Sequence, residues 1–296
     1  MPSTLLVTGA AGQLGQRVIT HLLDSQHVAA DSIVAATRHP EKLAAFVARG
    51  VRVRKADFDE SPSLEVAFAG VDRMLLISTD AIDRPGRRLS QHKAAIDAAR
   101  KAGVRRIIYT SMPNAGDSLV TFAPDHLGTE QALAASGLAW TILRNSWYME
   151  NLLMSASQAL VSGKWYTSAG EGRAANVSRE DCARAAAAAL ASQAPGNLFF
   201  DISGPQALTS DEIVAAISGV VGKPIEVVQL SDAQHAQALV AAGMPEFIAP
   251  LLVSFDANTR AGKVDITSNA VEQLTGTPPQ TLRSFLTAHK QALLRT

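Results

Sequence analysis

The sequence has few of the features that mark secreted, membrane or nucleic-acid-binding proteins. One cysteine, Cys182, stands among 296 residues, so the chain cannot form an internal disulfide and nothing indicates an oxidising compartment. No apolar run approaches the roughly 20 residues that span a bilayer, and the opening stretch lacks the segments of a signal peptide. Lysine plus arginine and aspartate plus glutamate both number 27, so overall charge attracts neither nucleic acid nor an anionic membrane. We therefore expect a cytoplasmic protein that binds neither.

Motifs for metal binding and hydrolysis are also missing. The seven histidines are scattered without a His-x-His pair, and a lone cysteine adds no thiolate cluster. No Ser/His/Asp order suggests a nucleophilic hydrolase, and "YTSMP" (109–113) is not a nucleophile elbow. The sequence predicts no metal site and no hydrolase.

Short aliphatic runs alternate with amphipathic helical segments over about the first 145 residues. The expected strands are 4–8, 32–37, 51–56, 73–78, 105–110 and 139–144. Such βαβ alternation predicts an α/β fold, a Rossmann-type doubly wound parallel sheet with helices on both faces.

After residue 145 the alternation of strands and helices becomes less regular. We expect a helix at 179–191, a strand at 197–203, a helix at 209–222 with a capping box to Glu212, and a strand at 224–231. The prediction is a Rossmann domain over 1–155, to which about 176–203 returns. A smaller C-terminal α/β domain over 156–175 and 204–296 would form the substrate cleft.

The strongest motif is "TLLVTGAAGQLGQRVITHLL" (4–23), in which a strand leads through Gly9-x-x-Gly12-x-x-Gly15 into a helix. The first glycine permits a tight turn, the second admits a pyrophosphate, and the third lets helix and strand pack closely. The alternative is a plain turn with incidental glycines, but the flanking strand and helix favour a dinucleotide site. The residues expected to hold the phosphates are Thr8, Gly9, Ala11, Gly12, Gln13, Leu14 and Gly15.

The end of the second expected strand indicates which dinucleotide binds. An NAD site usually has an acidic residue there, but "AATRHPEK" (35–42) has none before Glu41 and places Arg38 at the tip. A guanidinium can bind a 2′-phosphate through paired hydrogen bonds. NADPH is therefore favoured as cofactor, with a solvated surface arginine as the alternative.

Polar residues follow the third and fourth expected strands. Ligands of such sheets lie at the carboxyl ends of the strands. We therefore expect Asp57 and Phe58 to meet the adenine, and Ile77, Ser78 and Thr79 to lie beneath the middle of the cofactor. The equal alternative is that these residues are ordinary polar residues of surface loops without a role in binding.

Together with "RRIIYTS" (105–111), "HLGTE" (126–130) and "ILRNSWYMENL" (142–152), these motifs make nearly the whole chain resemble the NmrA-like atypical short-chain reductases. Within them it is most similar to the branch of type 2 NAD(P)H:quinone oxidoreductases and triphenylmethane-dye reductases. The resemblance implies an NADPH-binding Rossmann domain and a cleft against a small C-terminal domain. It implies that Thr110, Ser111, Asn145 and Tyr148 face the nicotinamide and the cleft.

The helix expected near 121–137 lacks the Tyr-x-x-x-Lys pair of ordinary carbonyl reductases and carries His126 and Glu130 instead. That tyrosine protonates an alkoxide, which is about as basic as hydroxide, whereas a hydroquinone anion resembles a phenolate. The difference of roughly 6 pKa units corresponds to about 8 kcal/mol. A quinone can therefore take its proton from solvent, and a cationic dye needs none, so quinones or dyes are favoured over ketones.

Three residues are candidates for contact with the acceptor. The Glu130 carboxylate, four residues after His126, should favour an imidazolium that could donate a proton; a structural, half-exposed pair is the alternative. Asn145 and Tyr148 could donate hydrogen bonds to a quinone oxygen, whereas Trp147 is more typical of the core.

Two functions remain open. The first is an NADPH-dependent oxidoreductase that passes hydride to a quinone or similar flat conjugated acceptor. The second is a non-catalytic NADP(H) sensor that regulates a protein partner, as in some NmrA-like proteins. A homodimer through a helix such as 86–101 is also left open.

Overall fold

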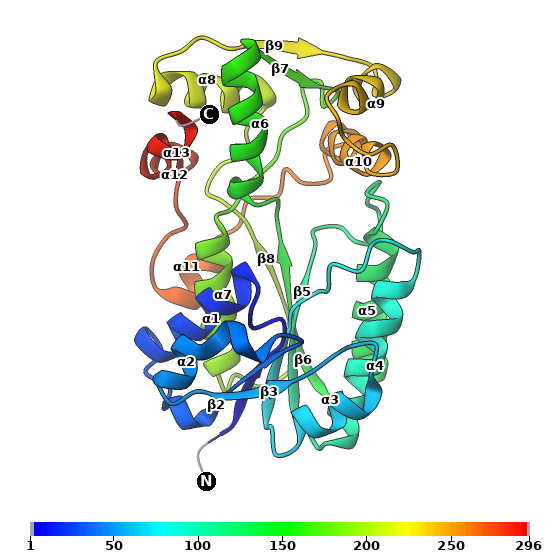
Figure 1. The fold of residues 1–296 in the computed structure, drawn as a ribbon, viewed down its shortest axis with the longest axis vertical. Helices are drawn as coiled ribbons and strands as arrows, with labels where there is room; N and C mark the ends of the chain where they lie inside the picture. The colour runs from blue at the N-terminus through cyan, green and yellow to red at the C-terminus, as the bar shows by residue number, and fades with distance from the viewer. Residues whose placement is uncertain (1–2, 295–296) are drawn as a thin grey trace.

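The computed structural model describes residues 3–294, and its centre is a seven-stranded sheet with the order β3-β2-β1-β4-β5-β6-β8 (Figure 1). All neighbouring strands in it are parallel. The strands are β1 (Leu5–Val7), β2 (Ile33–Thr37), β3 (Arg52–Lys55), β4 (Arg73–Leu76), β5 (Arg106–Ser111), β6 (Ala139–Asn145) and β8 (Leu198–Ile202). The predicted doubly wound sheet is confirmed. The strand order changes direction between β1 and β4, which is where such sheets bind ligands.

Helices cover both faces of this sheet (Figure 1). The first face carries α1 (Gln13–Asp24), α2 (Ala44–Ala48) and α7 (Arg179–Ala191), and the second carries α3 (Ser61–Phe68), α4 (Arg87–Lys101) and α5 (Ala123–Ala135). Short 3-10 turns at Ala30–Ser32 and Pro40–Leu43 precede β2 and α2.

The period of two along each strand divides the core between these faces. In β1, Leu5 and Val7 belong to the buried cluster under α1 and α7, while Leu6 belongs to the cluster under α3 and α4. The inner strands β1, β2 and β4 are buried on both sides, as expected for a parallel sheet with two helical layers, whereas the edge strand β3 is polar.

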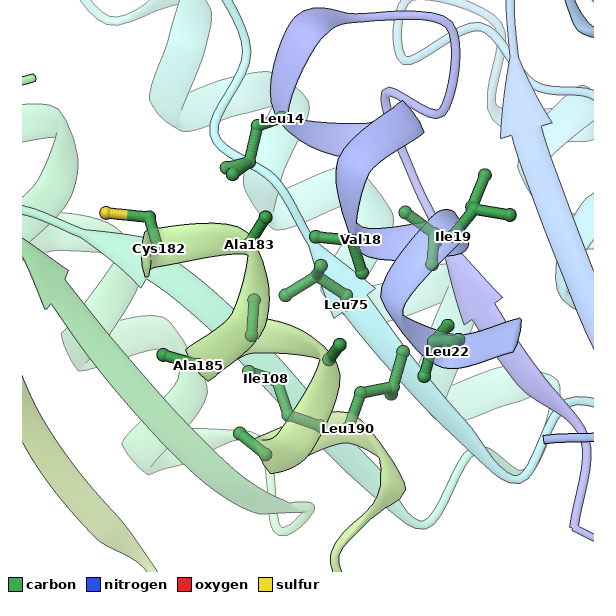
Figure 2. Close-up of a cluster of buried hydrophobic side chains, with 14 of the residues drawn as sticks. Leu14, Val18, Ile19, Leu22, Leu75, Ile108, Cys182, Ala183, Ala185 and Leu190 are labelled. Carbon is green, nitrogen blue, oxygen red and sulfur yellow. The ribbon is translucent and has the colours of Figure 1, made fainter. Parts of the chain in front are cut away.

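Small side chains let α7 lie close to the sheet. Residues 183 and 185–189 of this helix are alanines and all are buried. Figure 2 shows Ala183 beside Val18 of α1, with Leu75 of β4 and Ile108 of β5 beneath. The close packing fixes the position of α1, and with it the turn between β1 and α1.

The smaller part of the molecule lies above the carboxyl ends of the main strands (Figure 1). It contains α6 (Met149–Ser162), β7 (Lys164–Thr167), α8 (Ser210–Val221), β9 (Glu226–Gln229), α9 (Asp232–Ala241), α10 (Ala249–Arg260), α12 (Leu282–Ala288) and α13 (Lys290–Leu294). The predicted capping box is confirmed, with Thr209 as N-cap of α8 and Glu212 as its partner.

Two elements differ from the sequence expectations. Strand β7, which pairs in parallel with β9, was not predicted, because four residues directly after a helix show too little alternation. Helix α11 (Ala270–Thr275) lies in a segment that we assigned to the smaller domain, yet it packs on α7 and buries Ala270 and Val271 in the sheet core. An amphipathic pattern shows that a helix has an apolar face but not which core receives it.

No helix within residues 3–294 combines the length and the apolar character that a membrane span needs.

Candidate functional site

The turn between β1 and α1 exposes backbone N–H groups at the start of a helix. Gly9 has φ 58°, in the left-handed region that favours glycine. A Cβ atom on Gly15 would lie 2.4 Å from the carbonyl oxygen of Gly9, so only glycine permits this close approach. In the described chain no side chain caps the N-terminus of α1, and no acidic residue lies in its first turn. The first N–H groups and the positive end of the helix dipole are therefore open to an anion.

A hollow of about 520 Å³ lies beside this turn, where β1 to β4 end. The predicted cofactor residues that line it are Gly9, Ala11, Gly12, Arg38, Asp57, Phe58, Ile77, Ser78 and Thr79. The other lining residues are Thr37, His39, Lys42, Ala56, Asp80, Ala81, Asp83, Arg87 and Gln91. The hollow thus joins the glycine turn, the end of β2 and the loop after β4.

Two of the predicted cofactor residues brace the rim without lining the hollow. The Thr8 hydroxyl donates to the carbonyl of Leu75 at 3.1 Å and accepts the N–H of Ile77 at 3.0 Å. The Thr110 hydroxyl accepts the N–H of Ser78 at 2.9 Å. Both hydroxyls fix the start of the loop after β4.

Three other predicted residues have partners outside the hollow. The Leu14 side chain, 7% exposed, lies in the core under α1 (Figure 2), so only its backbone N–H remains for an anion. Gln13 Oε1 accepts a hydrogen bond from Arg179 at 2.6 Å. The Ser111 hydroxyl donates to Glu130 at 2.7 Å. These side chains position the site's elements relative to one another.

Arg38 is the less occupied of two arginines at the hollow. Its side chain is 54% exposed, and Nη2 lies 3.9 Å from Asp80 Oδ1. Arg87 is held by Asp59 at 2.6 Å and by Asp83 at 3.0 Å. A weakly paired guanidinium at the end of the second strand is free to bind a phosphate through two hydrogen bonds.

Several buried polar atoms without partners belong to residues at or just after the carboxyl ends of β4 and β6. Within residues 3–294 these include Thr79 Oγ1, Asn145 Oδ1, Ser146 Oγ and Trp147 Nε1. Such atoms are rare in folded proteins because each costs its desolvation free energy. With the glycine cradle and Arg38, they fit a dinucleotide with its phosphates on α1 and its polar nicotinamide end among these atoms.

Asn145 and Tyr148 lie close together at the end of β6. Asn145 Nδ2 lies 3.4 Å from the Tyr148 hydroxyl, and the Arg179 guanidinium covers the tyrosine ring at 4.7 Å from its centroid. Burial, and secondarily the neighbouring Cys182, raise the pKa of Tyr148. The phenol therefore stays protonated and can donate a hydrogen bond.

Aromatic side chains from both parts of the fold meet around Trp147, which directly precedes Tyr148 in the chain. Phe122 precedes α5, Trp147 follows β6 and Phe255 lies on α10. The centroid of Phe255 is 4.8 Å from that of Trp147 and 5.8 Å from that of Phe122. These three rings, together called the aromatic wall, pack against buried Met112. All three rings are only partly buried, and accessible aromatic surface of this kind can stack on a flat molecule.

The expectation that Glu130 favours an imidazolium form of His126 is wrong. His126 is buried, at 4% exposure, rather than half-exposed. Its Nδ1 lies 2.8 Å from the Tyr109 hydroxyl and its Nε2 lies 3.2 Å from Arg88 Nη1. Burial, then the charge of Arg88, lower the pKa of His126 well below its usual value. Because a guanidinium only donates, Nε2 accepts and Nδ1 carries the proton, so the ring is neutral.

Glu130 binds residues of β5 and β6 and not His126. Arg144 binds its carboxylate through Nε at 3.1 Å and Nη2 at 2.7 Å, and the Ser111 hydroxyl adds a third hydrogen bond. The hydrogen bonds that Arg144 donates to Glu130 raise the pKa of Arg144. Residues four apart share a helix face. The ionic partner of Glu130, however, is Arg144 of β6, and not the histidine on its own helix.

Four functional-site features were missed from the sequence: Arg87, Arg88, His92 and Tyr109. The segment "TDAIDRPGRR" (79–88) matches no motif, although its position after the fourth strand marked it as ligand-facing. His92 Nε2 accepts the N–H of Thr79 at 3.0 Å, and burial with the charge of Arg88 lowers the pKa of His92 to about 3. Such contacts join residues far apart in the sequence, so no spacing rule could reveal them.

Among residues 3–294, no three His, Cys, Asp or Glu side chains group together in a way that could hold a metal ion.

Comparison with known proteins identifies the family. A family model described as NAD(P)H-binding matches residues 9–193, which include the glycine turn and the hollow. The chain belongs to this NAD(P)H-binding family.

Two relatives are similar along nearly the whole chain. The quinone oxidoreductase 2 of Escherichia coli (strain K12) is 38% identical over 278 residues, 94% of this chain and 96% of that protein. The NAD(P)H azoreductase of Xenophilus azovorans is 30% identical over 97% of this chain and 98% of that protein.

Two solved structures of NAD(P)H-binding reductases share the fold. The NADPH-dependent quinone oxidoreductase of Escherichia coli, complexed with NADPH, has a TM-score of 0.92 and 37% identity, covering 96% of this chain and 99% of that one. The triphenylmethane reductase of Citrobacter sp., complexed with NADP(H), has a TM-score of 0.89 and 33% identity, covering 97% of this chain and 100% of that one. The resemblance read from the sequence motifs is confirmed.

Proposed function

We propose that this protein is an NADPH-dependent oxidoreductase that transfers hydride to a quinone or a similar flat conjugated acceptor. The observation that carries the proposal is the uncapped N-terminus of α1, cradled by Gly9 and Gly15, opening onto a hollow. The relatives named quinone oxidoreductase, azoreductase and triphenylmethane reductase support the same chemistry.

The residues of this chain would divide the binding of NADPH between backbone and side chains. The first N–H groups of α1 would hold the pyrophosphate, and Arg38 with Lys42 would hold the 2′-phosphate. Thr79 and Asn145 offer unpaired polar atoms to the nicotinamide end. NADPH supplies the hydride when bound.

The acceptor would lie between the nicotinamide end and the aromatic wall. There Tyr148 can donate a hydrogen bond to a carbonyl oxygen, and the wall excludes water while holding a flat ring. The residue at the position of the usual catalytic tyrosine, His126, is neutral and bound to Tyr109 and Arg88. We propose a positioning role for His126, with the proton of the hydroquinone coming from solvent.

A sensor without catalytic activity is the second candidate, because it too would lack the Tyr-x-x-x-Lys pair. The aromatic wall beside Asn145 and Tyr148 favours the enzyme, since a sensor has no need of an acceptor site at the nicotinamide end. NADPH oxidation by the purified protein, followed optically, separates the two. We expect oxidation with a neutral quinone and with a cationic dye, little with a simple aldehyde, and slower rates with NADH.

The outcomes of that assay are distinct. Binding of NADPH without oxidation in the presence of any acceptor would establish the sensor. Failure to bind either dinucleotide would remove both candidates. Aldehyde turnover as fast as quinone turnover would contradict the argument that no strong acid is present.

A cytoplasmic location and a homodimer are further proposals. The free, buried thiol of Cys182 is compatible with a reducing compartment. Cell fractionation tests the location, and light scattering of the purified protein tests the dimer.

A further inference from the structure

Arg88 is a buried cation whose contacts are all neutral. It lies in the first turn of α4 and is 8% exposed. Its Nε donates to the carbonyl of Thr79 at 2.5 Å, Nη1 donates to His126 Nε2 at 3.2 Å, and the guanidinium lies 4.8 Å from the centroid of Phe122. Within residues 3–294 it forms no ion pair, whereas Arg144 is bound by Glu130 at 2.7 Å.

Such an arrangement needs a physical reason. A buried charge without a counter-ion loses hydration that neutral partners only partly replace. Burial lowers the pKa of Arg88, and Tyr109, Asp125, Asp80 and Tyr148 act against that shift. A guanidinium nonetheless stays charged in proteins. No carboxylate within residues 3–294 bonds the guanidinium directly, so Asp125 and Asp80 offset its positive potential only from a distance.

The surroundings of Arg88 are those of the acceptor. Thr79 lines the hollow, Phe122 belongs to the aromatic wall, and Tyr148 is near enough to interact electrostatically with the guanidinium. Arg88 thus contacts one residue of the hollow and one of the aromatic wall, between which the proposed function places the acceptor. In a site that excludes water, a single charge at this range alters the energy of a charged ligand appreciably.

We propose that Arg88 sets the charge preference of the acceptor site, favouring neutral acceptors that become anions over cationic acceptors. This inference rests on the proposed function. A neutral quinone gains a hydride and becomes a hydroquinone monoanion, which a proton from water then neutralises, while NADPH becomes NADP⁺. A triarylmethyl cation gains the same hydride and becomes a neutral molecule.

The field of Arg88 acts differently on the two acceptors because their starting charges differ. A neutral quinone meets no penalty on binding, and the negative charge that develops is stabilised. A cationic dye is repelled on binding, and the repulsion fades as the hydride arrives. A positive potential therefore raises kcat for both acceptors, but it raises KM only for the dye.

The test compares neutral and charged replacements. We expect Arg88→Met and Arg88→Gln to lower kcat for a neutral quinone about tenfold with KM unchanged. For a cationic triarylmethane dye, KM should fall about tenfold together with kcat. Arg88→Lys keeps the charge and should keep the acceptor preference. Arg84→Met is the control. It removes a cation from the preceding loop, where the Arg84 side chain is 72% exposed, and it should change kcat and KM for neither acceptor.

Binding without turnover gives an independent measurement. Titration of the cationic dye into wild-type protein without NADPH should give an affinity about tenfold weaker than for Arg88→Met. The reduced, uncharged form of the dye should bind both proteins equally. Should neither neutral variant fold, Arg88→Lys still tests the proposal, since this variant keeps the charge and must keep the preference of the wild-type protein for the quinone over the cationic dye.

Several results would overturn the assignment. Equal losses for quinone and dye, with unchanged dye affinity, would mean that Arg88 only supports Thr79 and His126. Loss of the preference in Arg88→Lys would point to hydrogen-bond geometry and not charge. If no acceptor is reduced at all, the proposed function fails, while the dye affinities still test Arg88.

Discussion

At the amino end of α1 a ligand would meet backbone, whereas at the carboxyl ends of β5 and β6 it would meet side chains. The phosphate end consists of N–H groups whose directions follow from Gly9 and Gly15. The acceptor end combines a loop after β4, the start of α5 and the segment after β6. One end is fixed by local geometry and the other by contacts across the fold, so substitutions should affect the two ends in different ways.

The largest effect should come from a single methyl group at the phosphate end. In Gly15→Ala the new Cβ would lie 2.4 Å from the carbonyl oxygen of Gly9, which is backbone and cannot turn away. The turn must open, and we expect at least a hundredfold loss of NADPH affinity, measured by calorimetric titration. Gly219→Ala is the matched control, because no atom lies within 4 Å of its added methyl group. The control should bind NADPH normally and gain roughly 0.5–1 kcal/mol in stability. Normal NADPH binding by Gly15→Ala would disprove the phosphate site.

The next effect should distinguish the two dinucleotides. Arg38→Ala removes the weakly paired cation at the end of β2, so NADPH affinity should fall about thirtyfold, while NADH affinity changes less than twofold. The exposed Arg283→Ala serves as control for the loss of one positive charge. A parallel loss of NADH affinity would show that Arg38 supports the fold of the loop and does not read the 2′-phosphate.

A smaller effect should appear at the acceptor end. Tyr148→Phe removes a hydroxyl that lies 3.4 Å from Asn145 and keeps the ring under Arg179. If the phenol donates to the acceptor, kcat for a quinone should fall about tenfold, and NADPH affinity should not change. Tyr166→Phe, at an exposed residue of β7, controls for loss of a tyrosine hydroxyl. Unchanged kcat in Tyr148→Phe would leave the hydroxyl with a structural role only.

The same contrast explains what the sequence could predict. The order of strands and helices, the glycine turn and the position of Arg38 depend on periodicity and on residues within about ten positions of one another. These features could be predicted. The neutral state of His126 depends on Tyr109, which lies 17 positions away, and on Arg88, which lies 38 positions away. The spacing along one helix places Glu130 near His126, but it does not reveal Arg144, the residue with which Glu130 forms its ion pair.

The smaller part of the molecule shows a second limit. The capping box of α8 was visible because it is local, whereas β7 was not, since its pairing with β9 joins Lys164 to Glu226. For α11, the sequence shows an apolar face, and only the fold shows that α7 covers it.

The smallest predicted effect concerns pH and again separates the two ends. His92 and His126 are neutral and buried behind the acceptor end, with the pKa of His92 lowered to about 3. The unfolded chain binds protons at these residues near pH 6.5 and the folded chain does not. The contribution of the two neutral histidines to the free energy of unfolding is therefore fully present above the unfolded pKa of 6.5, and it is lost as the pH falls toward 3. When the pH falls from 7 to 6, each of the two histidines should lower the free energy of unfolding by about 0.7 kcal/mol.

His92→Asn keeps a donor and an acceptor for Thr129 and Thr79 while removing the titration. Urea unfolding at pH 7 and pH 6 should show a decrease smaller than in wild type by about 0.7 kcal/mol. The control is His27→Asn at an exposed residue with φ 51°, a left-handed conformation that asparagine tolerates. An equal decrease in wild type and in His92→Asn would mean that His92 already carries a proton in the folded state. The neutral network behind Thr79 would then be wrong, whereas the phosphate site, which depends on the backbone of Gly9 to Gly15, would be unaffected.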